Sequence, residues 1–370
     1  MKILLDARTV GPRIHGIARY GLNLLQAMAN LDHPYTIYVI GQDKSFFPFL
    51  KQGKSKLHFL RVRVPPYSLQ EQILLPWIVG RVHPDIYHCL TYACPVFVPS
   101  HLLFTLHDLL PLIRPIEFRD SVKFYYRTFV RAASIRASRI IVDSHYSAFW
   151  CAQLFGTPAE RISLVPLGGD HIGTLCSDRH GEEELLHVHL KGHSYFLCIA
   201  NARPHKRVLF LVKLFLSEST LEERDVHLVL VGGQHPEVHS WVAQHDHRSR
   251  IHTVGHVSDA LLVALYQKAM GLLCPSVGEG FGLPVLEAMY SGIPVVASHD
   301  GGVAELLEEV GLLLPPDEEE AWRRAMSEIA RDPQKGKTQG ALAASKAATY
   351  SWQRTAIETL RVYEEVLGIS

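Results

Sequence analysis

The sequence lacks the patterns that mark several common classes of protein. Its six cysteines form no CxxC pair and no regular framework, at positions 89, 94, 151, 176, 198 and 274. This argues against a disulfide-rich secreted fold and a cysteine-bound zinc site, and reduced thiols are expected. The opening stretch MKILLDARTV reaches Asp6 after an apolar run too short for a signal-peptide core or a membrane span. We therefore expect a cytoplasmic protein.

An excess of charge of either sign is also missing. Lysine plus arginine number 37 and aspartate plus glutamate number 37, so the formal net charge is zero. Without a global electrostatic field we expect no nucleic-acid partner, and any basic patch must be local. Histidine is frequent, at 22, and His235 and His239 are spaced by one helical turn. Because no HExxH pattern accompanies them, we interpret them as surface residues and expect no metal.

Short apolar runs alternate with helical patterns along the chain, which is typical of parallel α/β sheets. The first series of predicted strands spans 2–7, 35–40, 85–90, 102–108, 139–144 and 162–167. After a polar stretch around 173–193, a second series spans 195–200, 226–232, 250–255, 270–276, 294–298 and 311–315. Because 370 residues exceed what one core usually organises, we predict two open-sheet domains, 1–172 and 173–351, with a C-terminal helix in 352–370 that packs back on the first.

Ligands of open parallel sheets bind beyond the carboxyl ends of the strands, so the loops at those ends are the candidate sites. In EGFGLPVLEAMYSG (279–292), Pro284 fits the first helical position and leaves the amides of 281–283 at a helix N-terminus, which attracts anions. Glu287 can offer two oxygens to a vicinal diol such as a ribose, and Glu279 faces the same cavity. Complementing the helix dipole explains one glutamate but not the pair with its glycines, so we favour a ligand site.

Three other loops carry residues suited to a substrate. The stretch NARPHKRV (201–208) places three cations, Arg203 and Lys206 among them, before a helix, and we interpret it as a phosphate site rather than a surface charge cluster. The loop at Gly16 opens the first helix without a GxGxxG pattern, which disfavours NAD, although its amides can contact a phosphate. His107 ends a strand before a proline-rich loop, and we favour a substrate contact over a structural role.

Taken together, these stretches resemble the retaining GT-B-fold glycosyltransferases of the group 1, or family 4, type over nearly the whole chain. EGFGLPVLEAM is similar to the family motif of two glutamates with seven residues between them. CPS before it, and RPHKRVLFLV, TLHDLLP, VDSHYSA and VPLGGD, resemble further family blocks in the family order. The resemblance implies two Rossmann-like domains facing across a cleft, an acceptor-side domain first and a donor-binding domain second.

The resemblance also implies roles for individual residues. Glu287 would hold the ribose of a nucleotide sugar, and Glu279 would contact the transferred sugar. Lys206, helped by Arg203, would neutralise the departing diphosphate, and His107 would bond the donor sugar near its reacting carbon. Further donor contacts would come from the backbone of Phe281, Gly282, Leu283 and Gly16.

The enzyme implied by this resemblance transfers a hexose, with mannose as the first choice, from a nucleotide diphosphate sugar to a glycan or lipid-linked acceptor in cell-surface polysaccharide biosynthesis. No DxD triplet is present, which fits a metal-independent, retaining transferase that needs no cofactor. Ala200 and Arg207 depart from the residues common in the family's phosphate loop. The alternatives are a nucleotide-sugar epimerase or glycan phosphorylase of the same fold, and a non-catalytic sugar-nucleotide-binding subunit.

One segment, 119–139, is locally basic. It carries six arginines and lysines against one acid, with Lys123, Arg127 and Arg131 spaced by four residues. Such a helical face could rest on anionic lipid at the inner face of the cell membrane and present the site to a lipid-linked acceptor. An ordinary solvated face is the alternative.

Overall fold

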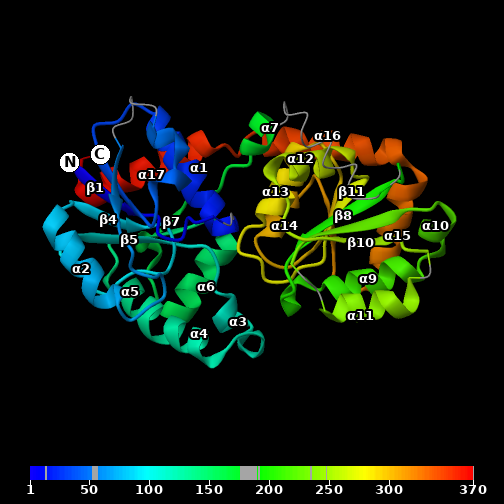
Figure 1. The fold of residues 1–370 in the computed structure, drawn as a ribbon, viewed down its shortest axis with the longest axis horizontal. Helices are drawn as coiled ribbons and strands as arrows, with labels where there is room; N and C mark the ends of the chain where they lie inside the picture. The colour runs from blue at the N-terminus through cyan, green and yellow to red at the C-terminus, as the bar shows by residue number, and fades with distance from the viewer. Residues whose placement is uncertain are drawn as a thin grey trace. The chain divides into compact units, whose positions relative to one another are not determined.

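The computed structural model describes residues 1–12, 15–51, 57–175, 190, 192–233, 236–246 and 248–369. Cys176 and His235 lie outside these described residues, as does most of the polar stretch 173–193. The chain forms two compact units (Figure 1). Unit 1 is Met1–Gly168 with Ser351–Ser370, and unit 2 is Gly169–Tyr350.

Unit 1 is built on a seven-stranded sheet with the order β3-β2-β1-β4-β5-β6-β7, all paired in parallel. The strands are β1 (Lys2–Asp6), β2 (Thr36–Gly41), β3 (Leu57–Arg61), β4 (Ile86–Cys89), β5 (His101–Leu106), β6 (Arg139–Val142) and β7 (Ile162–Leu164). The helices include α1 (Gly16–Asn30), α2 (Glu71–Val82), α3 (Leu110–Ile113), α4 (Asp120–Tyr125), α5 (Arg131–Arg136), α6 (His145–Phe155) and α17 (Trp352–Leu367). The strand order is that of a Rossmann-like sheet, which reverses between β1 and β4.

Both faces of the unit 1 sheet are covered, because alternate strand residues point to opposite sides. On one face, strand residues such as Tyr87 and Phe104 pack in one apolar core with side chains from α2, α5 and α6. On the other face, Thr105 meets Tyr20 of α1 through a 3.0 Å hydrogen bond, and His88 meets Tyr363 of α17 at 2.7 Å. The C-terminal helix therefore packs on the same face as α1.

Clear local signals set the ends of α17. Ser351 caps its N-terminus by accepting a hydrogen bond from the amide of Arg354 at 3.2 Å, and Gly368 ends it in the left-handed conformation. Thr355 and Tyr363 belong to its buried face, while none of its charged residues is buried. An amphipathic helix of this kind is stable only when its apolar face is covered, which unit 1 provides.

Unit 2 repeats the same architecture with six parallel strands in the order β10-β9-β8-β11-β12-β13. The strands are β8 (Tyr195–Ala200), β9 (His227–Gly232), β10 (Ile251–Val254), β11 (Gly271–Cys274), β12 (Val295–Ser298) and β13 (Leu312–Leu314). The helices include α7 (His171–Leu175), α9 (Val208–Ser217), α10 (Ser219–Glu223), α11 (Pro236–His245), α12 (Asp259–Lys268), α13 (Leu283–Tyr290), α14 (Val303–Leu307), α15 (Glu319–Arg331) and α16 (Pro333–Ala347). Helices α9, α10, α11 and α15 share one core with the sheet, and α12, α13 and α14 contact the sheet as well.

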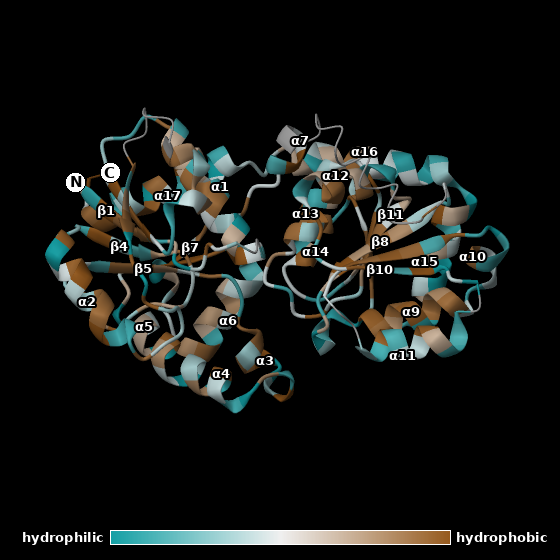
Figure 2. Cartoon of the chain, in the orientation of Figure 1, coloured by the Kyte–Doolittle hydropathy of each residue, from teal (hydrophilic) through white to brown (hydrophobic). Residues whose placement is uncertain are grey.

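The predicted fold class, two Rossmann-like open parallel sheets, is confirmed. The sequence prediction missed β3, an edge strand that has only one buried residue and includes a histidine and an arginine. An edge strand has a neighbouring strand on one side only and is less buried than a central strand. Its sequence therefore need not contain the continuous apolar run by which the other strands were predicted. Figure 2 shows the central strands of both units as mostly hydrophobic.

The basic segment 119–139 also differs from its prediction. A π-helical turn, Tyr126–Val130, separates α4 from α5. Because a π turn takes more residues than an α turn, a spacing of four residues does not keep side chains on one line across it. Lys123 is turned toward Asp120, with 2.7 Å between Nζ and Oδ1, whereas Arg127 and Arg131 are exposed. No helix within the described ranges is long and apolar enough to cross a membrane.

Candidate active site

The strand order of unit 2 reverses between β8 and β11, which are hydrogen-bonded neighbours. In open parallel sheets this reversal opens a crevice beyond the carboxyl ends of the two strands, where ligands bind. The chain leaves β8 through residues 201–207 and leaves β11 through residues 275–282. A backbone hydrogen bond of 2.9 Å from Val277 N to His205 O joins the two loops. Both loops that the sequence indicated in this unit therefore meet at one edge of the sheet.

An ion pair between Lys206 and Glu279 connects the side chains of these loops. Burial alone would lower the pKa of Lys206 and raise that of Glu279. The opposite charge of the partner and the hydrogen bond between them outweigh burial, so the pKa of Lys206 is raised and the pKa of Glu279 is lowered. Each side chain is 16% exposed, so the pair is a fixed, charged and still reachable group at neutral pH.

The backbone at Glu279 is held by the next loop of the sheet. Gly302 N donates to Glu279 O at 2.7 Å, and Glu279 forms an isolated parallel bridge with Gly301. Gly301 has a φ of +93°, and a Cβ there would lie 2.5 Å from Glu279 O. Only glycine fits this position, so the loop that follows β12 fixes the direction in which Glu279 projects.

The N-terminus of α13 lies next in the chain to Glu279. Gly282 precedes the helix with a φ of +95°, and no side chain caps it. A Cβ at Gly282 would lie 2.5 Å from Cγ2 of Val303, so this residue too must be glycine. Within the described part of the chain, the amides of residues 281–283 have no hydrogen-bond acceptor. Free amides at the start of a helix form an anion-binding site.

Glu287 lies one turn into α13 and is buried. Its Oε2 accepts a hydrogen bond from the hydroxyl of Tyr266 at 2.9 Å, and its Oε1 lies 3.1 Å from Nε2 of His171. These partners fix the orientation of the carboxylate. Because each carboxylate oxygen can accept more than one hydrogen bond, a diol can still be bound beside them.

The two arginines of the 201–207 loop behave differently. Arg203 is exposed at the start of the short helical turn Pro204–Lys206. Arg207 adopts a left-handed φ of +52° and directs its guanidinium to Asp317, with 2.7 Å between Nη2 and Oδ1. Arg207 stands where the family commonly has another residue. Because its side chain is directed to Asp317, it does not take the place of Lys206 beside Glu279.

In unit 1, His107 lies just beyond β5 and is nearly buried. Its Nδ1 lies 2.7 Å from Oδ2 of Asp143, and its Nε2 lies 3.2 Å from the carbonyl of Leu90. Burial alone would lower the pKa of His107, but the Asp143 carboxylate and these hydrogen bonds raise it. Because an acceptor lies beside each nitrogen, the surroundings of His107 favour its protonated form. The second oxygen of Asp143, Oδ1, is buried and has no hydrogen-bond partner among the described residues.

Replacing Asp143 by asparagine is expected to reverse the direction of this shift. The pKa of His107 should lie above 6.5 in the wild type and below it in Asp143→Asn, because burial then acts without the carboxylate. Selective NMR titration of the histidine ring protons measures both values. In the wild type the pair contributes stability fully below pH 6.5, and this contribution is lost as the pH rises through the raised native pKa.

The exposed variant Asp120→Asn serves as the control and should leave the titration of His107 unchanged. Urea denaturation at pH 6 should show Asp143→Asn to be about 3 kcal/mol less stable than the wild type. An unchanged His107 titration in Asp143→Asn would show that the carboxylate does not control the ring.

The loop that opens α1 lies close to His107. His15 caps α1 by accepting from the amide of Ala18 at 3.4 Å. The pKa of His15 is lowered by burial and then by the positive charge of His107. Apart from its chain neighbours and its own helix, no heavy atom of the described residues lies within 4 Å of the place where a Cβ at Gly16 would stand. The backbone at Gly16 is thus open to a ligand near the imidazole of His107.

Sequence reasoning missed the residues that orient these groups. Asp143 follows β6 in VDSHYSA, one strand away from His107, and its place at the carboxyl end of a strand was the available signal. His171 and Tyr266 are far from Glu287 in the sequence, and no pattern in the chain connects them. At the end of β1, the guanidinium of Arg8 is also buried, with Nε 2.8 Å from Oδ1 of Asp6.

The fold and the site together define a class of protein. Two Rossmann-like sheets, one of them with a lysine–glutamate pair and a free helix N-terminus at its switch point, are the features of a GT-B glycosyltransferase.

Comparison with known proteins agrees with this class. Residues 14–171 match the family model described as Glycosyltransferase Family 4, and residues 193–332 match the model described as Glycosyl transferases group 1. The O-antigen chain mannosyltransferase B of Escherichia coli is 25% identical over 382 residues, covering 98% of this chain and 100% of that protein. The O-antigen chain mannosyltransferase RfbU of Salmonella typhimurium is 26% identical over 274 residues, covering 69% of this chain and 73% of that protein.

Solved structures share the fold. Anabaena Alr3699/HepE, solved in complex with UDP and glucose, has a TM-score of 0.76 at 22% identity, covering 98% of this chain and 100% of that chain. The chain belongs to the family 4, or group 1, glycosyltransferases, and it is a glycosyltransferase.

Proposed function

We propose that the protein transfers mannose from a nucleotide diphosphate sugar, with retention of the anomeric configuration and without a metal or other cofactor at the reacting centre, to a growing cell-surface glycan or lipid-linked acceptor. The choice of mannose and of a surface glycan rests on the two O-antigen mannosyltransferases that this chain resembles. The observation that carries the proposal is the pairing of Lys206 with Glu279 at the switch point of unit 2.

Unit 2 supplies the groups suited to the nucleotide diphosphate. Lys206, with the exposed Arg203 in the same loop, offers positive charge to the phosphates. The amides of residues 281–283 add hydrogen-bond donors at the positive end of α13. Glu279 would bind hydroxyls of the sugar, and Glu287 would bind the ribose.

The reaction builds negative charge on the leaving group. The bond between the anomeric carbon and a diphosphate oxygen breaks, and its electron pair leaves with the diphosphate. The acceptor oxygen forms its bond to the anomeric carbon on the same face, and its proton passes to a diphosphate oxygen. Fixed cations and amides that already point at the developing charge lower the barrier without reorganising. No carboxylate nucleophile is needed on this route.

Unit 1 has two groups of its own that are suited to a substrate, His107 and the backbone at Gly16. The doubly protonated ring of His107 can donate to a sugar hydroxyl if the contact of its Nε2 with the Leu90 carbonyl, 3.2 Å long, is shared or exchanged. The open backbone at Gly16 can approach a phosphate or the acceptor. Asp143 would act as the positioning residue that keeps His107 protonated.

The proposal is tested by measuring nucleoside diphosphate release with a panel of nucleotide sugars, with and without glycan acceptors, and with EDTA in parallel. Acceptor-dependent release from a mannose donor, unaffected by EDTA at 25 °C, is expected. Loss of activity in EDTA would contradict the metal-independent route. Tight donor binding without release under any condition would favour a non-catalytic subunit instead.

We further propose that the outer surface of α2, α4 and α5 rests on an anionic membrane. Arg127, Arg131 and Arg136 are exposed there. Tyr125 of α4 donates a 2.5 Å hydrogen bond to Glu71 of α2, so these helices adjoin one another. Large apolar side chains are exposed on the same elements: Ile73, Trp77, Phe124 and Ile135. Figure 2 shows hydrophobic stretches along α2 and α4. Cations beside exposed apolar groups are suited to the headgroup region.

Reversing two of these charges, Arg127→Glu with Arg131→Glu, should weaken binding to vesicles rich in phosphatidylglycerol by at least about 30-fold. Each lost cation contributes about 1 kcal/mol near such a surface, and the added carboxylates are repelled by it. Vesicle sedimentation at 0.1 M salt measures the effect. The matched reversal Arg324→Glu with Lys337→Glu, at exposed positions of unit 2, should change binding little. Equal loss in both double variants would mean that only net charge matters.

A further inference from the structure

A cluster of histidine and aspartate side chains, residue types that bind metal ions, lies in unit 2 apart from the candidate active site. It is at the amino ends of the strands rather than the carboxyl ends. His193 precedes β8, and His227 is the first residue of β9. Asp225 lies in the turn before β9, and His252 belongs to β10. The active-site loops follow the carboxyl ends of β8 and β11, so this cluster occupies the opposite edge of the same sheet.

Strand register explains why these side chains meet. Tyr195 of β8 pairs with His227 of β9, and Val229 of β9 pairs with His252 of β10. Paired residues, and residues two apart on one strand, point to the same face. His227 and His252 therefore share a face of the sheet. His193 lies two residues before Tyr195, and Asp225 lies two residues before His227, so both are directed to that same face.

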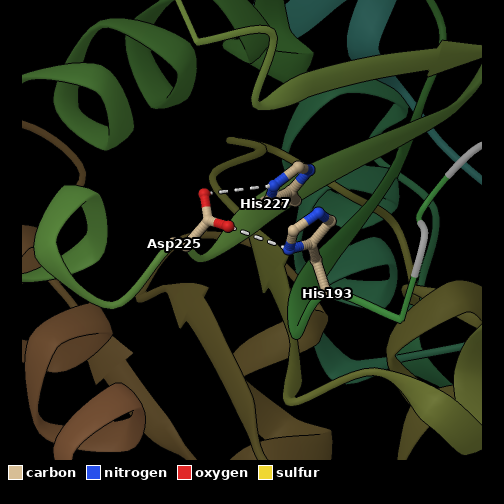
Figure 3. A group of neighbouring side chains, drawn as sticks. All are labelled: His193, Asp225 and His227. Carbon is tan, nitrogen blue, oxygen red and sulfur yellow. Dashed lines mark ion pairs between the residues drawn. The ribbon is translucent and has the colours of Figure 1, made fainter.

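The cluster is compact and internally bonded, as Figure 3 shows for three of its members. Nδ1 of His193 lies 2.9 Å from Oδ2 of Asp225, and Nε2 of His227 lies 3.6 Å from Oδ1 of the same carboxylate. The rings of His193 and His227 stack with centroids 4.2 Å apart. One potential ligand atom from each of the three residues lies within 4.8 Å of the others.

We propose that His193, Asp225 and His227 bind a divalent transition metal ion of the Zn²⁺ class, which clamps the start of β8 to the start of β9. Two imidazoles and one carboxylate, completed by a water, form a common ligand set for zinc. Ligand atoms about 2.0–2.1 Å from zinc lie about 3.3 Å apart in a tetrahedral site, so the separations of 2.9 Å and 3.6 Å in this structure must change when a metal binds. The side chains of His193 and Asp225 can move to make this change, because they are 33% and 55% exposed. The side chain of His227 is only 8% exposed and is held in place.

His227 is prepared for this role by its surroundings. Its Nδ1 lies 2.6 Å from Nε2 of His252, so His227 can donate its Nδ1 proton to His252 and leave Nε2 free for a metal. Burial lowers the pKa of His227, and the charges of His193 and then Arg250 lower it further, while Asp225 raises it. A neutral imidazole is the form that binds a metal. Arg250 opposes a bound cation, and the carboxylate of Asp225 offsets it.

Asp225 has a left-handed backbone, with a φ of +52°, which is a strained conformation for most residues. Such strain is often found at functional sites, and a metal site would be one of these. Aspartate tolerates this conformation better than most residues, but glycine and asparagine adopt it as well. Asparagine at this position therefore keeps the turn while it removes the charge, which makes Asp225→Asn a clean probe.

Titration of the metal-stripped full chain with ZnCl₂, followed by calorimetry, tests the proposal. We expect one site per chain and at least tenfold weaker binding in Asp225→Asn and in His193→Ala. Binding should be about tenfold weaker in His252→Gln, which replaces the ring beside Nδ1 of His227. His239→Ala, an exposed histidine on α11 of the same unit, is the matched control and should bind as the wild type does. Because His193 is only partly buried and Asp225 is exposed, their variants should fold.

X-ray absorption of the zinc complex provides the second measurement. Nitrogen or oxygen ligands at about 2.0–2.1 Å would support the proposal, whereas a sulfur ligand at about 2.3 Å would place the metal on a cysteine and overturn it. Absence of saturable binding, or stoichiometric binding that survives in the double variant His193→Ala with Asp225→Asn, would overturn it too. Zinc should raise the melting temperature of the wild type and not of that double variant. Removal of zinc should leave glycosyl transfer at 25 °C unchanged, so this test is independent of the proposed transferase mechanism.

Discussion

Lys206→Ala is expected to lower kcat by roughly 100- to 1,000-fold, because it removes a fixed cation aimed at charge that appears only as the diphosphate departs. Donor binding should weaken much less than turnover, since the ground-state donor carries the same phosphates but not the full developing charge. Initial rates of nucleoside diphosphate release, set beside calorimetric donor affinities, separate the two effects.

Two further variants keep this result interpretable. Lys206→Ala leaves Glu279 partly buried without its cation, which costs stability. The double variant Lys206→Ala with Glu279→Gln relieves that cost and should fold as well as the wild type while still turning over slowly. Arg207→Ala removes the neighbouring cation, which pairs with Asp317, and should keep turnover within about threefold of the wild type. Equal losses of kcat in the Lys206 and Arg207 variants would mean that any positive charge in this loop has the same effect, and that Lys206 has no specific role.

Glu287→Ala should weaken donor binding by about 10- to 100-fold, the range expected for hydrogen bonds to a charged group. At saturating donor, kcat should change little, because the ribose contact is the same in the ground and transition states. The KM and kcat of nucleoside diphosphate release measure this directly. Glu308→Ala, an exposed glutamate after α14, is the control. A large fall in kcat with an unchanged KM would place Glu287 at the reacting carbon rather than at the nucleotide.

The fold could be predicted from sequence because both sheets are buried on two sides. Strands such as β8 and β9 are continuous apolar runs, and their alternation with helices leaves little choice but a parallel sheet. The edge strand β3 was not predicted, because it is less buried and has no continuous apolar run. The π-helical turn within 119–139 could not be predicted either, because the same residues have the periodicity of an ordinary helix.

For the site, the sequence identified the loops but not the side-chain partners. Glycines and a proline mark a loop where backbone approaches a ligand, and Gly282 does have the positive φ that such a loop needs, whereas Gly280 does not. Gly301 also has a positive φ, but the sequence did not single out its loop. The pairing of Lys206 with Glu279, by contrast, joins the loops that follow two strands, β8 and β11, and only the order of the strands brings them together. The pairing of His107 with Asp143 has the same origin.

The histidine cluster illustrates this limit most clearly. His193, Asp225 and His227 have no spacing that resembles a metal motif, and we expected no metal from the sequence. They become neighbours because β8 and β9 pair in one particular register. A one-residue shift in that register would move His227 to the other face of the sheet and dissolve the cluster.

A crystal structure with the nucleoside diphosphate released in the turnover assay tests the central claim most directly. The account predicts phosphate oxygens within about 3 Å of Nζ of Lys206 and of the amide of Gly282 or Leu283, with the ribose at Glu287. Phosphates bound elsewhere, with the ion pair of Lys206 and Glu279 intact and uncontacted, would contradict it.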